Sequence, residues 1–374
     1  MADEIKATGS GPAAAAAPAT APATAAPARR EPEADDASEP LAAEDDSASL
    51  RDDDSAYSAP FSDLTSLRST VRQYQVEHGR TYHGLSAGKY AFPNDDEENQ
   101  RLDLQHNLWM LTLRGALCSS PKDEGARRVL DIGTGTGIWA IEYADMHPEA
   151  EVIGVDLSPI QPSLVPPNCS FEVDDLEKDW TWKEPFDFIF SRVMAGSFTD
   201  HQAHVNKAFA ALEPGGYFEA HEIDPNMGCD DGTLTEDNKL LRLNRHLMDA
   251  SAKMGRDLDV ARSYKSYLEN AGFVDIVERR YKWPLGPWPR DPHYKALGSW
   301  YYANIDEGLE GIVMAMLTRV LGLSFEDATL LCMEARKDLR NPRVHSYAPV
   351  YVVYGRKPEA SQPSEGLEVG DKAE

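Results

Sequence analysis

The sequence predicts a doubly wound, Rossmann-like α/β fold with a mostly parallel seven-stranded sheet and helical lid insertions. Three observations support this fold class. Apolar strand-like runs alternate with helical patterns between residues 128 and 222, which indicates a parallel sheet covered by helices on both faces. A glycine-rich turn separates the first run from the helix that follows it. Two long helical stretches interrupt the later strands.

Each element has its own signal. Short apolar runs predict buried strands near residues 128–132, 151–156, 169–173, 186–190, 216–222, 274–278 and 347–354. Apolar residues at helical spacing predict helices over residues 64–78, from about 94 to 118 with Asn94 as N-cap, directly after Gly137, and from about 200 to 212. The insertions cover residues 235–271 and 283–345. The second is rich in Trp and Tyr, which predicts either a helical lid with its own core or a pocket for a planar substrate.

The ends of the chain differ from the middle in composition. Residues 1–60 contain many acids and an alanine and proline tract from Pro12 to Pro27, with little apolar surface to bury. We therefore expect residues 1–60 to form a disordered acidic arm, residues 61–358 to form the folded domain, and residues 359–374 to form a disordered acidic tail.

Charge and residue usage argue against several classes of function. The net charge of −26 repels the phosphates of nucleic acid, so direct nucleic-acid binding is disfavoured. No apolar stretch reaches about 18 residues, which argues against a membrane span, and the alanine-rich start lacks the basic and apolar regions of a signal peptide. The four cysteines lack Cys-x-x-Cys spacing and predict neither a disulfide framework nor a zinc site. We expect a protein of the cytoplasm or nucleus, neither secreted nor embedded in a membrane.

The glycine-rich turn carries the strongest signal for a ligand. A buried run from Val129 to Ile132 leads into glycines at 133, 135 and 137, which admit positive φ and leave the backbone open to a ligand. A dinucleotide loop would need a glycine where Ile138 stands, and a P-loop would need a lysine that is absent. Asp131 lies two residues before the first glycine, where it repels a phosphate and attracts an ammonium group. The expected ligand is a nucleoside with a cationic amino-acid tail.

Two later strands also end in carboxylates. Asp156 follows the apolar run 152–155, at about the distance from the glycine turn at which a carboxylate accepts hydrogen bonds from both ribose hydroxyls. The run 171–173 ends in Asp174 and Asp175. One of these two carboxylates could accept the adenine amino hydrogen, and Asp175 is preferred.

The order of acid, glycine loop, acid and acid at successive strand ends resembles the S-adenosylmethionine-dependent methyltransferases of the doubly wound class. The resemblance covers about residues 127 to 223 and includes Asp187 on the fourth strand and the glycine turn at 215–216 before the fifth. It implies a class I methyltransferase fold, S-adenosyl-L-methionine as the cofactor, and an enzyme that transfers a methyl group. The alternatives are an incidental glycine turn in another α/β protein and a nicotinamide oxidoreductase.

A second block, from Tyr82 to His106, is more specific than the glycine loop. It contains Tyr-His-Gly, Tyr-x-x-Pro-Asn-Asp-x-x-Glu and Arg-Leu-Asp-Leu-Gln-His. Together with Ile138-Trp139 and the terminal run 352–358, it resembles the fungal LaeA-like (TAM-domain) methyltransferases over about residues 60 to 358. This resemblance implies methylation of a small molecule in fungal secondary metabolism, or a nuclear regulator that works through protein partners. The acidic arm favours a partner-binding role in the second case.

The candidate cofactor-binding residues lie at strand ends and in the front block. They are Tyr82, Tyr90, Asp131, Gly133, Thr134, Gly135, Gly137, Asp156, Leu157, Asp174, Asp175 and Arg192. The resemblance places Tyr82 and Tyr90 over the cofactor. If a general base is used, His221 and Glu222 at the end of the fifth strand are the candidates, and strand alternation lets only one of them face the crevice. No metal is expected, because His201 and His204 share a helix face but lack a third ligand.

Overall fold

The computed structural model describes residues 39–43, 74–86 and 88–359 of the chain. Most of the predicted acidic arm and nearly all of the predicted acidic tail therefore lie outside the described residues. Within the arm, residues 39–43 contact the domain, where Ala43 and Pro289 form an isolated antiparallel bridge. Among the described residues, no helix combines the length and the apolar character needed to cross a bilayer.

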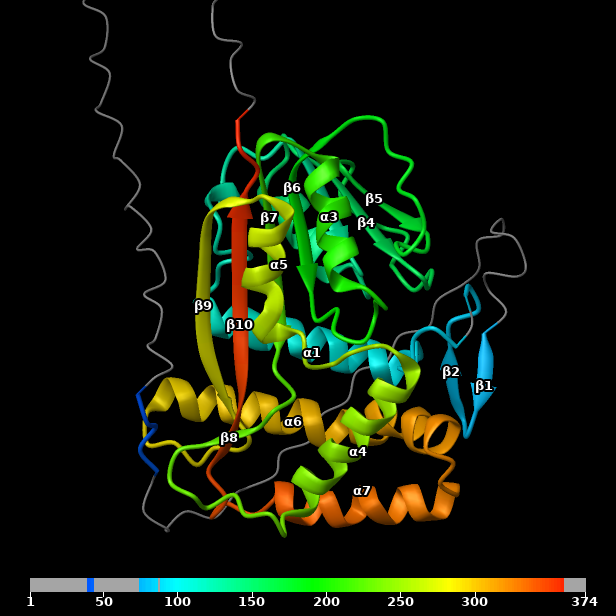
Figure 1. Ribbon diagram of the computed structural model, residues 1–374, viewed down its shortest axis with the longest axis vertical. Helices are drawn as coiled ribbons and strands as arrows, with labels where there is room; N and C mark the ends of the chain where they lie inside the picture. Colours follow the sequence, from blue (N-terminus) through cyan, green and yellow to red (C-terminus); the bar gives the residue numbers. More distant parts are fainter. Residues whose placement is uncertain (1–38, 44–73, 87, 360–374) are drawn as a thin grey trace, which may run out of the picture. The chain divides into compact units, whose positions relative to one another are not determined.

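The central sheet has the predicted strands, and the prediction of a mostly parallel sheet is confirmed. Its strands are β3 (Arg128–Ile132), β4 (Glu151–Asp156), β5 (Cys169–Val173), β6 (Phe186–Arg192), β7 (Leu212–Ile223), β9 (Val274–Pro284) and β10 (Ser346–Arg356). The order is β5-β4-β3-β6-β7-β10, with β9 along the other edge of β10. Strands β3 to β7 run parallel, and β10 runs antiparallel to β7 and β9. A two-residue strand, β8 (Gly228–Cys229), adds an eighth member beside the start of β10 (Figure 1).

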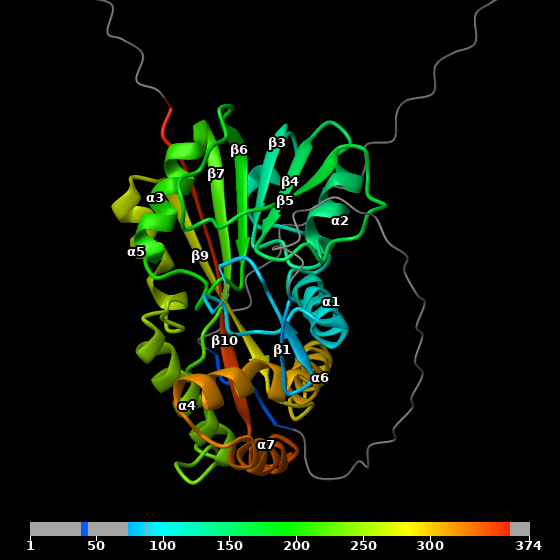
Figure 2. The ribbon, with the colours of Figure 1, turned by 90° about the vertical axis from the view of Figure 1, so that its right-hand side faces the viewer.

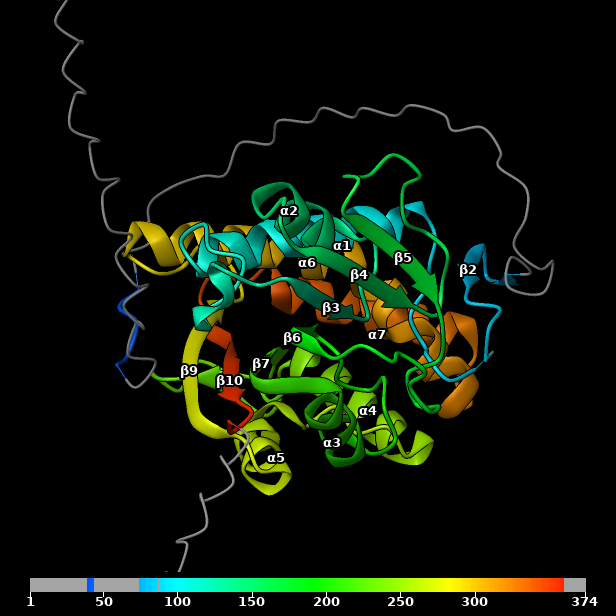
Figure 3. The same cartoon turned by 90° about the horizontal axis from the view of Figure 1, so that it is seen from above.

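Helices cover both faces of this sheet, as alternation predicts. Figure 3 shows α1 (Asp96–Thr112) and α2 (Ile138–Met146) on one face, with α3 (His201–Ala211) and α5 (Tyr264–Ala271) on the other. On the first face, the ring of Trp139 stacks on that of Phe190 with centroids 3.9 Å apart. On the second face, Val205 and Leu268 pack with Phe218 in a separate buried cluster. Each face thus has its own core.

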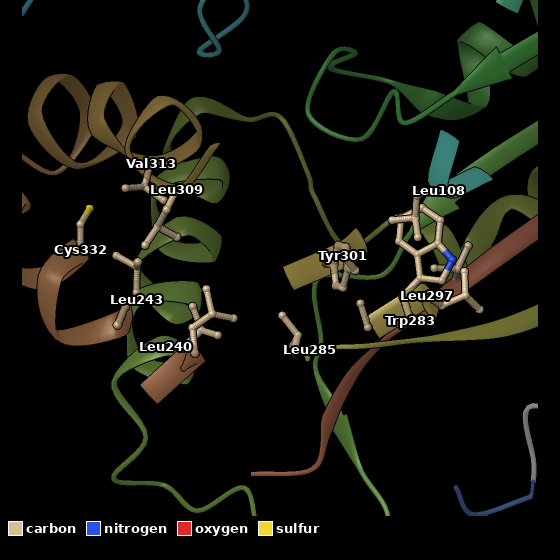
Figure 4. Packing of buried hydrophobic residues seen from close by; sticks show 14 of the residues in the cluster. Leu108, Leu240, Leu243, Trp283, Leu285, Leu297, Tyr301, Leu309, Val313 and Cys332 are labelled. Atoms are coloured by element: carbon tan, nitrogen blue, oxygen red, sulfur yellow. The ribbon is translucent and has the colours of Figure 1, made fainter. Parts of the chain in front are cut away.

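The later insertions form a helical layer beyond the sheet. Helices α4 (Lys239–Met254), α6 (Pro292–Ala315) and α7 (Phe325–Leu339), with a π-helical turn at Met316–Val320, lie below strands β4 to β7 in Figures 1 and 2. Figure 4 shows Leu243, Leu309 and Cys332 converging from these helices in one buried cluster. Trp283 and Tyr301 of the aromatic insertion belong to the same cluster. The insertion therefore packs as a helical layer, and it shares its core with α1, β9 and β10.

The segment before α1 folds differently from the expectation. Residues 64–73 of the predicted helix lie outside the described residues, but Gln75–Glu77 form strand β1, so the helix is wrong at that end. Strand β1 pairs with β2 (Arg80–Tyr82). The N-cap of α1 is Asp95 and not Asn94, because the Asp95 carboxylate accepts the N–H of Glu98 and two guanidinium hydrogens of Arg80 at 2.6 and 2.7 Å.

The packing of α6 can be tested at Gly298, where the helix comes close to the turn that contains Gly286. A Cβ on Gly298 would lie 2.0 Å from the carbonyl oxygen of Gly286, which is backbone and cannot rotate away. Replacing Gly298 with alanine is therefore expected to lower the free energy of unfolding by about 1–3 kcal/mol, measured by urea denaturation. Ser299→Ala is the matched control. Ser299 is the next residue along the helix and its side chain is exposed, so this substitution should change stability by less than about 0.5 kcal/mol. A Gly298→Ala protein as stable as the control would contradict the packing.

Candidate functional site

A large cavity opens at the carboxyl ends of β3, β4, β5 and β6, where the strand order reverses from one side of β3 to the other. The empty space within it, together with the open solvent at its mouth, amounts to about 1300 Å³. The lining of the cavity comes from the glycine turn after β3 and the start of α2, the segments after β4, β5 and β6, and one face of α1. His83 and residues between Lys89 and Asn94 complete it. Most of the predicted site residues meet here.

The glycine turn is held by the two carboxylates that flank it. Asp131 accepts a hydrogen bond from the Thr134 hydroxyl at 2.6 Å, and Asp156 accepts the backbone N–H of Gly135 at 2.9 Å. All four of Asp131, Thr134, Gly135 and Asp156 line the cavity, together with Gly133. The turn thus presents backbone and carboxylate oxygens to the same space.

Gly137 has a different role from the other two glycines. It does not line the cavity, and it caps α2 with φ +81°. A Cβ there would lie 2.4 Å from the ring of Phe171 on β5. The placement contradicts the predicted contact with a ligand, because Gly137 is required by the turn and by the packing of Phe171.

Burial changes the acid–base behaviour of both carboxylates. Removal from water raises the pKa of Asp131 to about 6, although the Thr134 hydroxyl and the charge of Arg192 oppose this shift. Burial likewise raises the pKa of Asp156 to about 6, against the hydrogen bonds from the N–H groups of Ser158 and Gly135. Two partly unsatisfied anions that face one cavity favour a ligand with a cation and hydroxyl donors.

Arg192, at the end of β6, is one of three cationic side chains that line the cavity, with Lys89 and Arg101. Its guanidinium donates to Nδ1 of His106 at 3.1 Å, and Nε2 of His106 donates to Glu142 at 3.0 Å. Burial lowers the pKa of His106 to about 3, so this ring stays neutral and orients the guanidinium without neutralising it. Among the described residues, Arg192 forms no ion pair with a carboxylate within 4 Å. Its charge is therefore available to an anionic group in the cavity.

At the end of β5, the two neighbouring aspartates differ in their hydrogen-bond partners. Asp175 accepts hydrogen bonds from the Ser86 hydroxyl at 2.8 Å and from Lys89 Nζ at 2.6 Å. Burial alone would raise the pKa of Asp175, but the bonds from Lys89 and Ser86 lower it. From the described residues, Asp174 accepts one hydrogen bond, from the backbone N–H of Asp175. Both line the cavity with Leu157, yet Asp174 keeps more of its carboxylate free for a ligand.

Of the two tyrosines predicted to contact the cofactor, one lines the cavity and the other does not. Tyr90 lines the cavity, half-buried in the segment before α1. Tyr82 does not line it, and the structure places its ring beneath the guanidinium of Arg319, 4.2 Å from the ring centroid. It packs there with Ala315 and Met316 because β2 turns this side chain toward the helical layer. The prediction that Tyr82 lies over a ligand is therefore contradicted by its position.

His221 and Glu222 do not reach the cavity. His221 is fully buried, stacks on Trp109 with centroids 4.8 Å apart, and shares a hydrogen bond of 2.6 Å with Glu219. The Glu222 carboxylate lies beneath the turn after β6 and accepts backbone N–H groups of Met194 and Ala195. Their placement corrects the prediction of a general base at either position, because core packing encloses one side chain and backbone hydrogen bonds occupy the other.

Sequence reasoning missed a polar row on α1. Glu98, Arg101 and Gln105 share one face of the helix and line the cavity. Arg101 donates to both carboxylate oxygens of Glu98 at 2.9 and 2.7 Å, whereas Gln105, only 7% exposed, has no hydrogen-bond partner for its side chain among the described residues. The spacing of three and four residues on one helix face was the available signal.

The site shows no sign of a metal centre within the part of the chain that the structure describes. No group of three His, Cys, Asp or Glu side chains there could hold an ion. His204 stacks on Phe198 with ring centroids 3.8 Å apart, and Nδ1 of His201 lies 3.5 Å from the hydroxyl of Tyr264. Burial lowers the pKa of these two histidines to about 3 and about 4, so both pack as neutral rings.

Comparison with known proteins supports the same chemistry. The family described as "Methyltransferase domain" matches residues 104–278. Methyltransferase pytC of Aspergillus terreus is 42% identical over 298 residues, which cover 79% of this chain and 92% of that protein. The secondary metabolism regulator LAE1 of Cochliobolus heterostrophus is 38% identical over 291 residues, covering 76% and 95%. The protein-methionine methyltransferase laeA of Emericella nidulans is 35% identical over 305 residues, covering 80% and 81%.

These relatives include both methyltransferases and regulators. The similarity covers 76% or more of this chain and 81% or more of each of these three proteins. It favours a methyltransferase over a nicotinamide oxidoreductase. On this basis, the chain belongs to the LaeA-like family of fungal methyltransferases.

Proposed function

We propose that this protein is an S-adenosyl-L-methionine-dependent methyltransferase that modifies a small molecule of fungal secondary metabolism. The observation that carries the proposal is the pair of buried carboxylates, Asp131 and Asp156, on either side of a glycine turn that faces the cavity. A phosphate ligand would meet two negative charges there, whereas a cationic nucleoside would be attracted.

The residues of the cavity fit the parts of this cofactor. Asp131 would hold the ammonium group and Arg192 the carboxylate, since each lacks an ion-pair partner of its own among the described residues. Asp156 would accept the ribose hydroxyls. For the adenine amino group Asp174 is favoured over Asp175, because Lys89 and Ser86 already occupy the second carboxylate.

The chain would act mainly by binding and orientation. When bound, the cofactor would supply a methyl group on a sulfonium sulfur, and its transfer to the acceptor would release a neutral thioether, a good leaving group that needs no metal. Placing the acceptor in line with the methyl group can itself supply several kcal/mol of the barrier reduction. The cavity walls formed by α1 and the turn after β6 would provide this placement.

The α1 face indicates an acceptor that is polar but uncharged. Glu98 neutralises Arg101 within the wall, and a second bond from Arg101 to Asn304 of α6, at 3.3 Å, fixes the pair. The free amide of Gln105 can both donate and accept hydrogen bonds. Tyr90 and Phe92 add aromatic surface. A planar molecule with a hydroxyl or amide group would match this lining.

A regulatory role is the second candidate. The acidic composition of residues 1–60 favours it, since long acidic segments commonly bind partner proteins. In that case the protein would act in the nucleus, whereas a biosynthetic enzyme would act in the cytoplasm. Removing residues 1–38 separates the two roles: loss of complex formation with turnover retained supports the regulator, and unchanged metabolite profiles in the fungus support the biosynthetic enzyme.

Replacing Asp156 with asparagine tests the cofactor site. Loss of the charged acceptor for the ribose hydroxyls is expected to weaken S-adenosylmethionine binding by about 1.5–3 kcal/mol, roughly tenfold or more, measured by isothermal calorimetry. Asp179→Asn is the matched control, because Asp179 is exposed and lies outside the cavity. Equal affinities for the two variants would count decisively against the assigned site.

The affinity for S-adenosylmethionine should also depend on pH. The pKa values of Asp131 and Asp156 are both raised to about 6, and only the ionised carboxylates attract the cofactor. As the pH falls below 6, the dissociation constant is expected to rise by up to about tenfold per pH unit for each group. Calorimetry between pH 5 and 8 checks this, and Asp156→Asn should show a shallower slope. A pH-independent affinity would refute the role of these carboxylates.

A further inference from the structure

The turn after β6 forms one wall of the cavity and lies directly against the glycine loop. Val193, Met194, Ser197 and Phe198 all line the cavity. A Cβ built on Gly133 would lie 2.2 Å from Sδ of Met194, so this side chain fills the space that the glycine leaves. The position of Met194 therefore sets the shape of the cavity beside the loop proposed to hold the methionine part of the cofactor.

This turn contains backbone strain. Val193 has φ +54°, a left-handed conformation that is rare for a β-branched residue and costs on the order of 1–3 kcal/mol. Its N–H donates to the carbonyl of His221 at 2.7 Å. A strained turn persists only where its surroundings hold it, so the groups that accept its remaining N–H donors determine its geometry.

Glu222 provides these acceptors. Its carboxylate is 1% exposed, and it accepts the N–H of Met194 at 2.8 Å and that of Ala195 at 3.3 Å. The hydroxyl of Tyr264 donates to the same carboxylate at 3.3 Å. Only the ionised form of a carboxyl group accepts all three bonds without presenting a donor of its own.

We propose that Glu222 is a positioning residue for methyl transfer, whose ionised carboxylate holds the strained turn 193–195 against the glycine loop. The proposal rests on the proposed function for its catalytic consequence. Glu222 touches neither cofactor nor acceptor, because it acts through the backbone of Met194 and Ala195. Protonation of Glu222 removes one acceptor, relaxes the turn and displaces the cavity wall.

Among the titratable groups that face one another around Glu222, Glu222 itself has the pKa closest to neutral pH. Burial raises its pKa to about 7, against the bonds from Met194, Ala195 and Tyr264. The other titratable groups that face it stay neutral: burial raises the pKa of Tyr90, Tyr264 and Tyr351, its register partner on β10, and lowers that of His201 to about 4. The held turn is therefore expected above pH 7 and the relaxed turn below it.

The experiment compares full-length wild type with Glu222→Gln from pH 5.5 to 8.5, at saturating S-adenosylmethionine so that Asp131 and Asp156 stay ionised. The wild-type kcat is expected to rise through a midpoint near 7. Glu222→Gln should lose about 10- to 100-fold in kcat at pH 8, since small displacements near the chemistry cost this much, and its profile should be flat. The KM for the cofactor should change much less than kcat. A wild-type kcat or a wild-type pH profile in Glu222→Gln would overturn the proposal.

Glu219→Gln is the matched control. Glu219 is a second fully buried glutamate on β7, and it accepts the N–H groups of Ser119 and Ser120 at 2.7 and 2.8 Å, in a turn outside the cavity. Its substitution should lower stability but keep the wild-type pH midpoint. A flat pH profile in Glu219→Gln, like the one expected for Glu222→Gln, would show a general effect of losing a buried charge and would overturn the proposal.

Two further measurements keep the proposal testable. If Glu222→Gln does not fold, Tyr264→Phe removes a bond that stabilises the ionised carboxylate, so the pH midpoint should rise; an unchanged midpoint would overturn the proposal. Wild type that binds no S-adenosylmethionine would instead refute the proposed function.

The pH dependence of the free energy of unfolding can be measured without turnover. Because the pKa of Glu222 is raised in the folded protein, the stability of wild type relative to Glu222→Gln is expected to fall as the pH rises from about 5 to 7. A stability difference that stays constant with pH would contradict the raised pKa.

Discussion

Buried carboxylates that accept backbone N–H groups are the interaction on which this site depends. Charge-assisted bonds of this kind are short and strong, and they replace the water that an anion loses on burial. At the sheet ends each carboxylate fixes a neighbouring loop. The pairs are Asp156 with Gly135 and Ser158, Asp187 with Arg127 and Arg128, Glu219 with Ser119 and Ser120, and Glu222 with Met194 and Ala195. Two of these pairs, those of Asp156 and Glu222, fix segments that line the cavity, and the other two fix segments outside it.

The helical layer is attached to the cavity through α1. Asn304 of α6 accepts from Arg101 and donates to the backbone carbonyl of the same residue at 3.1 Å. Gly308, one turn further along α6, leaves room for the Arg101 stem, since a Cβ there would lie 2.2 Å from its Cδ. The layer shares its core cluster with α1, β9 and β10, and no residue of the glycine turn belongs to that cluster. Changes in its outer helices can therefore leave the glycine turn intact while altering the α1 wall.

The two halves of the cavity differ in charge. The β3, β4 and β6 ends present two carboxylates and a guanidinium without full partners, which suits a ligand that carries both signs of charge. The α1 wall presents a neutralised ion pair and a free amide. This contrast is what a site needs in order to hold a charged methyl donor beside an uncharged acceptor. It also leaves the chemistry to placement, in agreement with the burial of His221 and Glu222 away from the cavity.

Much of this was available from the sequence. Short apolar runs gave the seven principal strands, because a strand buried on both faces must be apolar throughout. The glycine turn with Asp131 and Asp156 gave the cofactor side of the site, because strand ends that follow such runs meet at one edge of a sheet. What failed depended on side-chain direction. Neighbouring elements turn the side chains of Tyr82 and His221 into the core. Gly137 is instead required by its turn and by the ring of Phe171.

The sequence by itself determined the fold, the order of the strands along the chain and the carboxylates at their ends, since these follow from local patterns of apolar residues and turns. Only the tertiary structure decided which groups face the cavity. The row of Glu98, Arg101 and Gln105, the strained Val193 and the bonds to Glu222 each depend on contacts between segments far apart in the chain. Local periodicity carries no information about such contacts, because the energy that fixes them arises only when the segments pack together.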